Sequence, residues 1–442
     1  MSSILDAVSI VLVCGGEIFP IKRQNYLRAF PGYWAFPGGK VDDIDSTSRD
    51  THPLIAGLPA RLWGAIRREA REELGVDLFD LMNQGSVTAI QSIGVALTPD
   101  FNPYRFRTYF FSIHLSDKPS FTVDSNEAEI AQWMTPQSFI EKYQSGQMLV
   151  VPPVLKVVKL LKNNIFCSEE SLDLDYDANS VVPMIETVCG VKQYMPLSNT
   201  LPPANRTNAF VIGDILVDPS PRDELEMIKL LNSIKDERLK AILLTHHHSD
   251  HHQFAPDIAR QLNLEIYISL DSHQRIESYR SDYFSGISLR HLAEGQVVTQ
   301  WLGQNVRVVE VPGHDRGQVA LMPESRSWFI AGDLFQGVGT VVIGGAEGDM
   351  QEYMRTLEKV IALSPRAVFP SHGIALGGVN ILERTLTHRK MREMQIVDLL
   401  KENKLEDEIL KILYSDIDQR LLKYARENIR SHISKIIKEK LI

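Results

Sequence analysis

The 442-residue sequence predicts a multidomain protein of mixed α/β and α+β class. Three observations lead to this prediction. The chain is longer than a domain built around one hydrophobic core usually is. Strand and helix signals alternate through two long stretches, and an acidic segment of linker composition separates them. A polar helical stretch follows the second of them. The expected parts are a first domain at 1–150, a linker at 151–180, a second domain at 181–380 and a helical tail at 381–442.

Composition limits the classes of partner. Apolar residues make up 44% and charged residues 23%, which is ordinary for a globular protein. The net charge is -9, and residues 381–442 carry 14 Lys and Arg against 11 Asp and Glu, so the tail contributes +3 and the remainder -12. This balance argues against nucleic-acid binding over the whole surface, and any contact with a polyanion would be local.

The sequence favours a cytoplasmic protein. Cys14, Cys167 and Cys189 show no paired spacing, which fits a reducing compartment. The apolar stretch 7–13 follows Asp6 without a basic flank and predicts a strand rather than a signal peptide. No stretch approaches the length of a membrane span, so we expect no membrane partner. Nothing in the sequence indicates an oligomeric state.

The first domain opens with a strand, a glycine turn and a second short strand, followed by Y-W-A-F-P-G-G-K. A strong helical signal comes next. Pro59 suits its first turn and Gly75 suits its end. Apolar residues four positions apart form a stripe that should pack on a sheet: Leu62, Ile66, Ala70 and Leu74.

Three carboxylates lie beside this stripe, on Glu69, Glu72 and Glu73. Carboxylates so close repel one another, and a divalent cation relieves the repulsion. Hard oxygen ligands favour Mg2+ or Mn2+, bound together with substrate phosphates. The plainer interpretation is an ordinary acidic helix face exposed to solvent.

The segment R-E-A-R-E-E-L-G-V resembles the core of the Nudix box, and Gly39 with Asp45 resembles its opening glycine and acidic residue. The stretch 127–136, E-A-E-I-A-Q-W-M-T-P, resembles the closing part of that fold. The resemblance implies an α/β/α sandwich in which Arg68 orients the carboxylates and contacts substrate. It also implies that the three glutamates bind the metal, with Glu69 and Glu73 catalytic.

The sequence departs from this family in two ways. Its first acidic position, Asp45, is an aspartate where the family has a glutamate, and a long insert follows it. Between Asp45 and Arg68 lie 22 residues, where the usual pattern has about 7. The insert is either a substrate loop or a tolerated surface excursion. A domain altered in this way could also serve as a non-catalytic ligand sensor.

A segment before the helix carries a second resemblance. Arg28-x-x-x-Gly32-x-x-x-Phe36-Pro37-Gly38-Gly39 resembles the second part of the coenzyme A diphosphatase signature. It implies that Arg28, Gly38 and Gly39 bind substrate. The first part of the signature matches poorly, because Arg23 is one residue too close to Arg28.

In the second domain, F-V-I-G-D-I-L-V-D predicts a hairpin closed at Gly213 and Asp214. Helices are expected at 223–235 and 256–262, and strands at 241–244 and 264–269. This alternation predicts sheets covered by helices.

The stretch 241–252, A-I-L-L-T-H-H-H-S-D-H-H, places five histidines in seven positions directly after an apolar run. The run predicts a buried strand, so the polar cluster should lie on the loop at its C-terminal end. The pattern His246-x-His248-x-Asp250-His251 offers three imidazoles and a carboxylate. That set suits zinc or another borderline first-row metal.

Further ligands must come from elsewhere in the chain. His314, Asp333 and His372 each follow another apolar run, so all three should meet the histidine cluster at one end of a sheet. A lone histidine is usually a packing or surface group. Seven metal-capable residues, each placed after a predicted strand, favour a metal site instead.

Here the chain, over 181–380, resembles the metallo-beta-lactamase-fold hydrolases, especially the glyoxalase II-like and lactamase-beta-2-like branches. The resemblance implies an αββα sandwich and two metal ions, zinc or alternatively iron or manganese. Ions about 3.5 to 4 Å apart would share a water whose pKa falls toward about 7, and so supply a hydroxide nucleophile. The implied assignment is His246, His248 and His314 on one ion, Asp250, His251 and His372 on the other, and Asp333 as the bridge, with Asp250 also catalytic.

Neighbouring residues receive weaker assignments. Asp218 resembles the aspartate that supports a metal-binding histidine in this family. A turn-forming role before Pro219 is the alternative. His247 and His252 obtain no ligand role from their spacing.

The tail contains H-R-x-x-R-E-x-Q-I at 388–396, which resembles the start of the winged-helix-like tail of lactamase-beta-2-like proteins. A packing or oligomerisation module is the alternative, because no distinctive charge stripe identifies a partner.

These features predict a bifunctional metal-dependent hydrolase. The first domain would cleave a diphosphate linkage in a nucleoside diphosphate derivative, with a coenzyme A type of substrate favoured. The second would hydrolyse a thioester or ester with a metal-bound hydroxide, acyl-coenzyme A being the expected partner. RNA processing is the alternative, supported by the mildly basic tail and opposed by the charge of the remainder.

Overall fold

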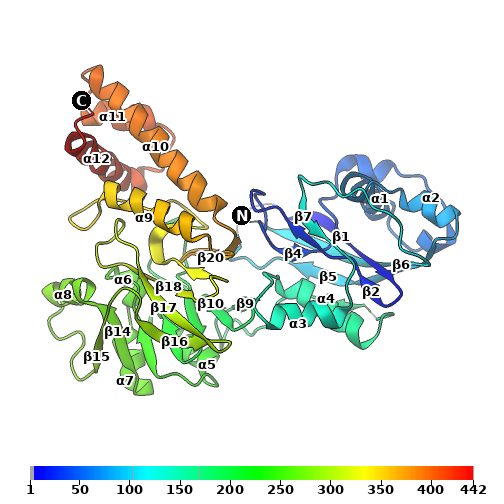
Figure 1. Cartoon of the computed structure of the whole chain (residues 1–442), viewed down its shortest axis with the longest axis horizontal. Coiled ribbons are helices and arrows are strands. Elements are labelled where there is room, and N and C mark those ends of the chain that lie inside the picture. Colours follow the sequence, from blue (N-terminus) through cyan, green and yellow to red (C-terminus); the bar gives the residue numbers. More distant parts are fainter. Residues whose placement is uncertain (1–3, 103, 168, 442) are drawn as a thin grey trace. The chain divides into compact units, whose positions relative to one another are not determined.

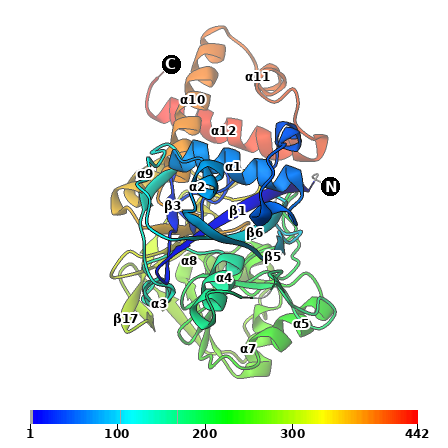
Figure 2. The ribbon, with the colours of Figure 1, turned by 90° about the vertical axis from the view of Figure 1, so that its right-hand side faces the viewer.

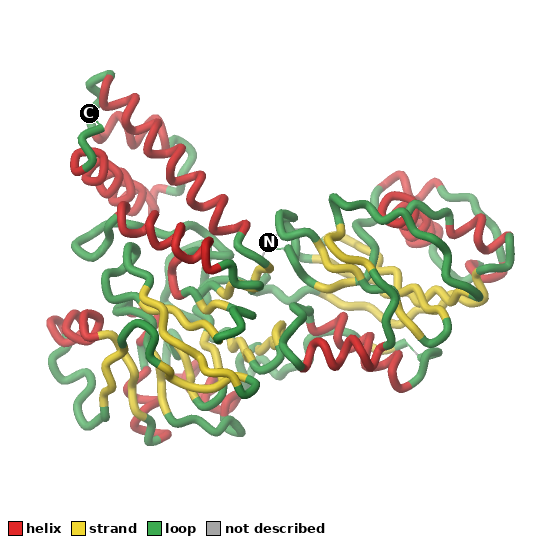
Figure 3. The backbone as a smooth tube through the Cα atoms, in the orientation of Figure 1, coloured by secondary structure: helices red, strands yellow, loops and turns green. Residues whose placement is uncertain are grey.

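The computed structural model describes residues 4–102, 104–167 and 169–441 (Figure 1). The chain divides into two compact units. The first is Met1–Tyr176 with Ile185–Cys189, and the second is Asp177–Met184 with Gly190–Ile442. Both units combine strands and helices, joined by loops of varied length (Figure 3).

A five-stranded sheet lies at the centre of the first unit, in the order β2-β1-β6-β5-β8. β1 is parallel to β6 along its whole length, and β5 is antiparallel to β6. A smaller sheet has the order β4-β3-β7. The strands are β1 (Leu5–Cys14), β2 (Glu17–Ile18), β3 (Ile21–Arg23), β4 (Trp34–Ala35), β5 (Val87–Leu97), β6 (Phe106–Leu115), β7 (Ala128–Ala131) and β8 (Glu170–Ser171).

Helices cover both faces of the large sheet, with α1 and α2 on one side and α3 and α4 on the other (Figures 1 and 2). The helices are α1 (Ala60–Leu74), α2 (Leu78–Asn83), α3 (Pro136–Gln144) and α4 (Pro152–Asn163). The predicted stripe of α1 is buried in the core between that helix and the sheet. α1 ends at Gly75, whose positive φ of 70° forms the left-handed cap. The expected α/β/α sandwich is confirmed.

The structure differs from the expected linker at 151–180. Residues 152–163 form α4, whose Val154, Val157 and Val158 belong to a core cluster of the first unit. β9 (Met184–Val188) also returns to this unit, where Thr187 O accepts a hydrogen bond from Val150 N (2.8 Å). The acidic composition that suggested a linker begins only after α4, so the first unit extends further than its strand and helix signals indicated.

The second unit contains two sheets. Within this unit, the strands of one run in the order β15-β14-β13-β12-β11-β10, and those of the other in the order β16-β17-β18-β19-β20-β21. The strands of the first are β10 (Val191–Tyr194), β11 (Ala209–Ile212), β12 (Ile215–Val217), β13 (Ala241–Leu243), β14 (Glu265–Ser269) and β15 (Leu289–Leu292). Those of the second are β16 (Val297–Trp301), β17 (Gln304–Glu310), β18 (Val319–Pro323), β19 (Phe329–Ile330), β20 (Ala367–Phe369) and β21 (Leu376–Gly377).

Each sheet of the second unit has its own helices. One core joins α5, α7 and α8 to β10–β14, and another joins α9 to β17–β20. The helices are α5 (Glu224–Ile234), α7 (Ala255–Leu262), α8 (Leu270–Tyr279) and α9 (Met350–Leu363). This is the expected αββα sandwich, and its helices and strands begin and end close to the predicted positions.

The C-terminal tail consists of α10 (Asn380–Lys401), α11 (Glu406–Leu413), the short helix η4 (Gln419–Leu421) and α12 (Leu422–Lys438). The three longer helices lie together in both views (Figures 1 and 2) and share a small core that includes Ile396, Ile409 and Ile429. Its likeness to a winged helix stays a prediction. Across the part of the chain that the structure describes, no helix is both long and apolar enough to cross a membrane.

Candidate metal centres

Strand direction brings the predicted ligands of the second unit together. β12, β13 and β14 are parallel, so the histidine loop after β13 and Asp218 after β12 leave the same edge of their sheet. In the other sheet, β17, β19 and β20 run in one direction, and each precedes one further ligand. Thr245 O accepts a hydrogen bond from Val319 N (2.9 Å), which links the two edges.

Three imidazole nitrogens converge in the first cluster. His248 Nδ1 lies 3.0 Å from His246 Nε2 and 3.0 Å from His314 Nε2. One ring nitrogen of each of these three residues lies within 4.8 Å of the corresponding nitrogens of the other two. His246 is fully buried, and His314 is 6% exposed.

The outer nitrogens of two of these rings are already engaged. His314 Nδ1 donates to Val342 O (2.8 Å). Thr245 Oγ1 donates its only proton to Asp218 Oδ2 (2.6 Å), so it accepts from His246 Nδ1 (3.0 Å). Both Nε2 atoms therefore present lone pairs to His248 Nδ1, which carries at most one proton. Such an arrangement of lone pairs suits a cation.

Burial keeps the rings of His246 and His314 neutral. It lowers the pKa of His314 to about 4. Burial, with the neighbouring histidines, also lowers the pKa of His246 well below its usual value. Neutral imidazoles are the form that binds metals.

A second cluster contains Asp250, His251 and His372. His251 Nδ1 donates to Asp218 Oδ2 (2.9 Å), and His372 Nδ1 donates to Arg206 O (2.8 Å). Their Nε2 atoms thus face inward, 3.9 Å from Asp250 Oδ1 and 3.7 Å from Asp250 Oδ2 respectively. The second-ion set that the sequence predicted is brought together in space.

Asp333 lies between the two clusters, in the short helix η3 (Gly332–Leu334). Its Oδ1 is 3.6 Å from His251 Nε2 and 3.5 Å from His372 Nε2, and its Oδ2 is 3.7 Å from His314 Nε2. Among the described residues, His251 Nε2 and Asp333 Oδ1 are buried polar atoms without a hydrogen-bond partner. Such unsatisfied atoms are costly unless another group, such as a metal ion, engages them.

The electrostatics favour a positive charge at this point. Burial alone would lower the pKa of His251, but the carboxylates of Asp333 and Asp250 outweigh it and raise that pKa well above its usual value. Burial likewise opposes ionisation of Asp333, yet His372 and His251 hold its pKa well below the usual range. The donor set, the unsatisfied atoms and the electrostatics together fit divalent cations.

The remaining histidines of the loop have other surroundings. His252 is buried and contacts Tyr283 Oη (2.8 Å) and His247 O (3.0 Å), so it supports the loop from behind. His247 pairs closely with Asp315, which is itself fully buried.

Sequence reasoning missed two acidic residues near the first cluster. Asp315 pairs with His247, and Glu347 Oε1 lies 3.6 Å from His248 Nε2. Asp315 directly follows the predicted ligand His314, which was the available signal. Glu347 lies in a glycine-rich loop without periodicity, and nothing in the sequence distinguished it.

In the first unit, Arg68 is the centre of the candidate Nudix site. Its guanidinium donates to both carboxylate oxygens of Asp45 (3.0 Å each), and also to Glu69 Oε1 (2.7 Å) and Glu72 Oε2 (3.1 Å). Asp45 is buried at the start of the insert, in the short helix η1 (Asp43–Thr47). The acidic residue before the insert and the arginine after it therefore meet despite the extra length.

The two glycines that sequence reasoning assigned to substrate lie against the glutamates. Gly38 N donates to Glu73 Oε2 (3.0 Å). A Cβ on Gly39 would come within 2.2 Å of Glu69 Oε1, so a larger residue would displace that carboxylate from its present position. Burial raises the pKa of Glu73 to about 8, and burial also raises the pKa of Glu69.

The structure does not gather all the predicted groups of this site. Among the described residues of the first unit, no three candidate ligands have their atoms within 4.8 Å of one another. The side chain of Glu72 is 59% exposed and pairs with Arg68. Arg28 is exposed. Arg23, which sequence reasoning set aside, interacts with Glu73, and its buried Nε has no hydrogen-bond partner within the described part of the chain.

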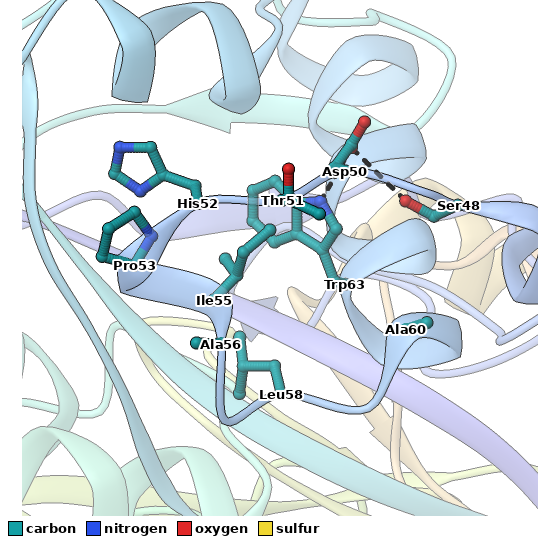
Figure 4. A pocket seen from close by; sticks show the side chains of 10 residues that line it. All are labelled: Ser48, Asp50, Thr51, His52, Pro53, Ile55, Ala56, Leu58, Ala60 and Trp63. Atoms are coloured by element: carbon teal, nitrogen blue, oxygen red, sulfur yellow. Dashed lines mark hydrogen bonds between the residues drawn. The ribbon is translucent and has the colours of Figure 1, made fainter.

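Within the 22 residues between Asp45 and Arg68, 46–59 precede α1 and fold back on it. Asp50 accepts hydrogen bonds from Trp63 Nε1 (2.9 Å) and Arg67 Nη1 (2.7 Å), and Ile55 of the short helix η2 (Pro53–Ile55) is buried. The insert and the start of α1 line an open pocket of about 570 Å³ (Figure 4). The added length is thus an ordered surface element.

Comparisons with known proteins match each unit to a family. Residues 202–372 match the sequence model of the metallo-beta-lactamase superfamily, and residues 4–150 match that of the NUDIX domain. A Drosophila melanogaster protein named "Beta-lactamase-like protein 2 homolog" is 30% identical over 247 residues, which cover 53% of this chain and 82% of that protein. An "Atrochrysone carboxyl ACP thioesterase" of Aspergillus fumigatus is 28% identical over 199 residues, covering 43% of this chain and 58% of that protein.

One solved structure supports the fold of the second unit. A beta-lactamase domain protein from Burkholderia ambifaria, 20% identical, superposes with a TM-score of 0.52 over 60% of this chain and 90% of its own. Fold and sites together define a hydrolase built around clusters suited to divalent metals. The chain belongs to the metallo-beta-lactamase superfamily, and residues 4–150 are a NUDIX domain.

Proposed function

We propose that the chain is a bifunctional hydrolase with a dinuclear metal centre in the lactamase-fold unit and a Mg2+ or Mn2+ site in the NUDIX domain. The observation that carries the first part is the convergence of seven ligand groups on two adjacent positions, with Asp333 in reach of both. We expect both ions to be zinc, with iron or manganese as alternatives.

The residues of the lactamase-fold unit have separable tasks. Asp218 fixes the tautomer of His251, and Val342 O fixes that of His314, so that both Nε2 atoms face the centre. Bound ions would acidify a water and polarise the carbonyl of the substrate. Asp250 has the most exposed carboxylate of the set, with 17% of its side chain accessible compared with 7% for Asp333. It is therefore placed to accept the proton that the attacking water releases.

A thioester or other ester is the favoured substrate of this unit. Support comes from the relative named as a thioesterase, although this chain spans 58% of its length. Outside the tail the chain carries a net charge of -12, which opposes binding of an RNA backbone. An acyl-coenzyme A would also give the fusion a chemical logic, because a coenzyme A diphosphatase acts on another bond of the same molecule.

In the NUDIX domain, Arg68 would hold Glu69 and Glu72 until a metal and the substrate diphosphate bind, and Glu73 would serve as a metal ligand and base. One observation favours a second candidate, a ligand sensor without catalysis. In this structure Arg68 neutralises two of the three carboxylates, and the three do not converge on one point.

The test is a parallel product assay of the full-length protein with coenzyme A, acyl-coenzyme A and single-stranded RNA, with added Mg2+. The proposal predicts release of free acid from acyl-coenzyme A and cleavage of the coenzyme A diphosphate. Thioester hydrolysis without diphosphate cleavage would favour the sensor. RNA cleavage that is lost in His246→Ala, with coenzyme A substrates left intact, would replace the proposal by RNA processing.

A further inference from the structure

The loop at 336–349, between η3 and α9, carries two groups onto the first metal cluster. Val342 O accepts the hydrogen bond from His314 Nδ1 (2.8 Å), and Glu347 Oε1 lies 3.6 Å from His248 Nε2. The orientation of two predicted ligands therefore depends on where this loop is held.

The loop contains no strand or long helix, so its backbone groups need partners from other parts of the chain. The C-terminal tail provides them. Arg389 Nη2 of α10 donates to Val341 O (2.6 Å), and Asn428 Oδ1 of α12 accepts from Ile343 N (2.9 Å). Val342 is thus held on both sides, and its own carbonyl is directed to His314.

Arg389 and Asn428 form one buried unit. Asn428 Oδ1 also accepts from Arg389 Nη1 (3.2 Å), and the two residues are 3% and 6% exposed. The guanidinium lies 5.5 Å from the ring centre of Tyr353, whose hydroxyl donates to Leu334 O beside Asp333 (2.7 Å). Buried hydrogen bonds to a charged group are costly to break, because the partners left behind stay unsatisfied.

Three further contacts of α12 hold the end of the loop. Glu427 accepts from Gly345 N (3.2 Å), Ser431 Oγ accepts from Met350 N (3.1 Å), and Lys438 pairs with Asp349 (2.8 Å). A Cβ on Gly344 would lie 2.5 Å from Glu427 Cβ, so the loop packs directly on the helix. The same helix thus fixes the loop on both sides of Glu347.

We propose that α10 and α12 are a positioning module for the metal centre, with Arg389 and Asn428 as positioning residues that act on His314 through Val341–Ile343. The inference rests on the dinuclear centre of the proposed function. It gives the tail a role within its own chain: without it, Val342 O is no longer fixed, and His314 loses the bond that selects its metal-binding tautomer.

The test measures the zinc affinity of the metal-free protein by competition with a chromogenic chelator. The midpoint temperature of thermal unfolding is measured for each variant as well. Asn428→Leu removes the shared acceptor oxygen, and we expect zinc to bind about tenfold more weakly or worse. Asn428→Asp keeps an acceptor for both donors and should retain zinc affinity. Arg426→Ala is the matched control, because Arg426 lies on the same helix but, among the residues that the structure describes, pairs only with Glu406 and Asp407 of α11.

Asn428→Ser, which is shorter and cannot reach Ile343 N, replaces the leucine variant if that variant does not fold. Wild-type zinc affinity in the tested variant, together with a lowered midpoint, would reduce the tail to a structural role and overturn the inference. A wild-type protein that binds neither zinc, iron nor manganese would instead overturn the dinuclear centre, and the inference with it.

Discussion

At the scale of single residues, Asp218 shows how one carboxylate organises the histidine loop. It accepts from Thr245 N (2.8 Å), Thr245 Oγ1 (2.6 Å) and His251 Nδ1 (2.9 Å). Through Thr245 it also selects the tautomer of His246, so it acts on both clusters. The sequence placed Asp218 between a supporting and a turn-forming role, and its contacts favour the supporting one.

We predict that Asp218→Asn weakens retention of transition metal about 10- to 100-fold, the usual effect of losing a partner outside the ligand set. The amide nitrogen cannot accept the proton of His251 Nδ1. The measurement is metal content after dialysis against a weak chelator. Asp214→Asn is the control. Asp214 lies in the turn before β12, the strand that Asp218 follows, and it contacts Thr299 and Lys240. Equal metal content in both variants would contradict the assigned role of Asp218.

A pH dependence follows for the NUDIX domain. Burial raises the pKa of Glu73 to about 8, so at neutral pH a metal ion must displace a proton from it. Affinity for Mg2+ should rise with pH up to about 8 and level off above it. Titration calorimetry between pH 6 and 9 measures this, and Glu73→Gln should remove the dependence. A flat profile in the wild-type protein would show that Glu73 is ionised before Mg2+ binds.

Residue chemistry explains which parts of the sites were visible in the sequence. His246, His248, Asp250 and His251 stand in one short pattern, and the other ligands each follow an apolar run. Val342 offers only a backbone carbonyl, and Glu347 lies in an irregular loop. Both lie at the site because of contacts between distant parts of the chain, which no local sequence pattern indicates.

At the scale of elements, Arg67 holds the insert of the first unit in its ordered position. Its guanidinium bonds both Asp50 of the insert (2.7 Å) and Asp77, the N-cap of α2 (2.8 Å). The sequence revealed the extra length but not its order, because the ion pairs join positions 10 and 17 residues apart. α4 was misjudged for a related reason: its apolar residues pack on a surface formed by distant parts of the chain, which the local sequence does not reveal.

Arg67→Ala should free the insert from α1 while leaving the core in place. We expect faster cleavage within 46–59 in limited proteolysis of the full-length protein, read by mass spectrometry, with a loss of stability of about 1 to 2 kcal/mol. Arg71→Ala is the control, since Arg71 is more exposed and contacts Asp77 without Asp50. Protection of the insert in both variants would mean that Ile55 and its neighbours hold it without the ion pairs.

At the scale of the whole molecule, the two units have separate cores and separate candidate sites. Domains with their own cores usually keep their activities independently. Asp250→Ala or His248→Ala should therefore abolish ester hydrolysis and spare diphosphate cleavage, and Glu73→Gln should do the reverse. Loss of both activities from one change, in a protein that keeps its fold by circular dichroism, would indicate one shared site.

Elemental analysis of the purified 442-residue chain measures the occupancy of the dinuclear centre. We expect about two transition-metal ions per chain, as for a two-metal hydrolytic site. We also expect a clear loss of metal in Asp333→Ala, because that carboxylate lies between the clusters. A protein purified without chelators that holds no zinc, iron or manganese, and takes up none on titration, would show that the two clusters form no metal centre.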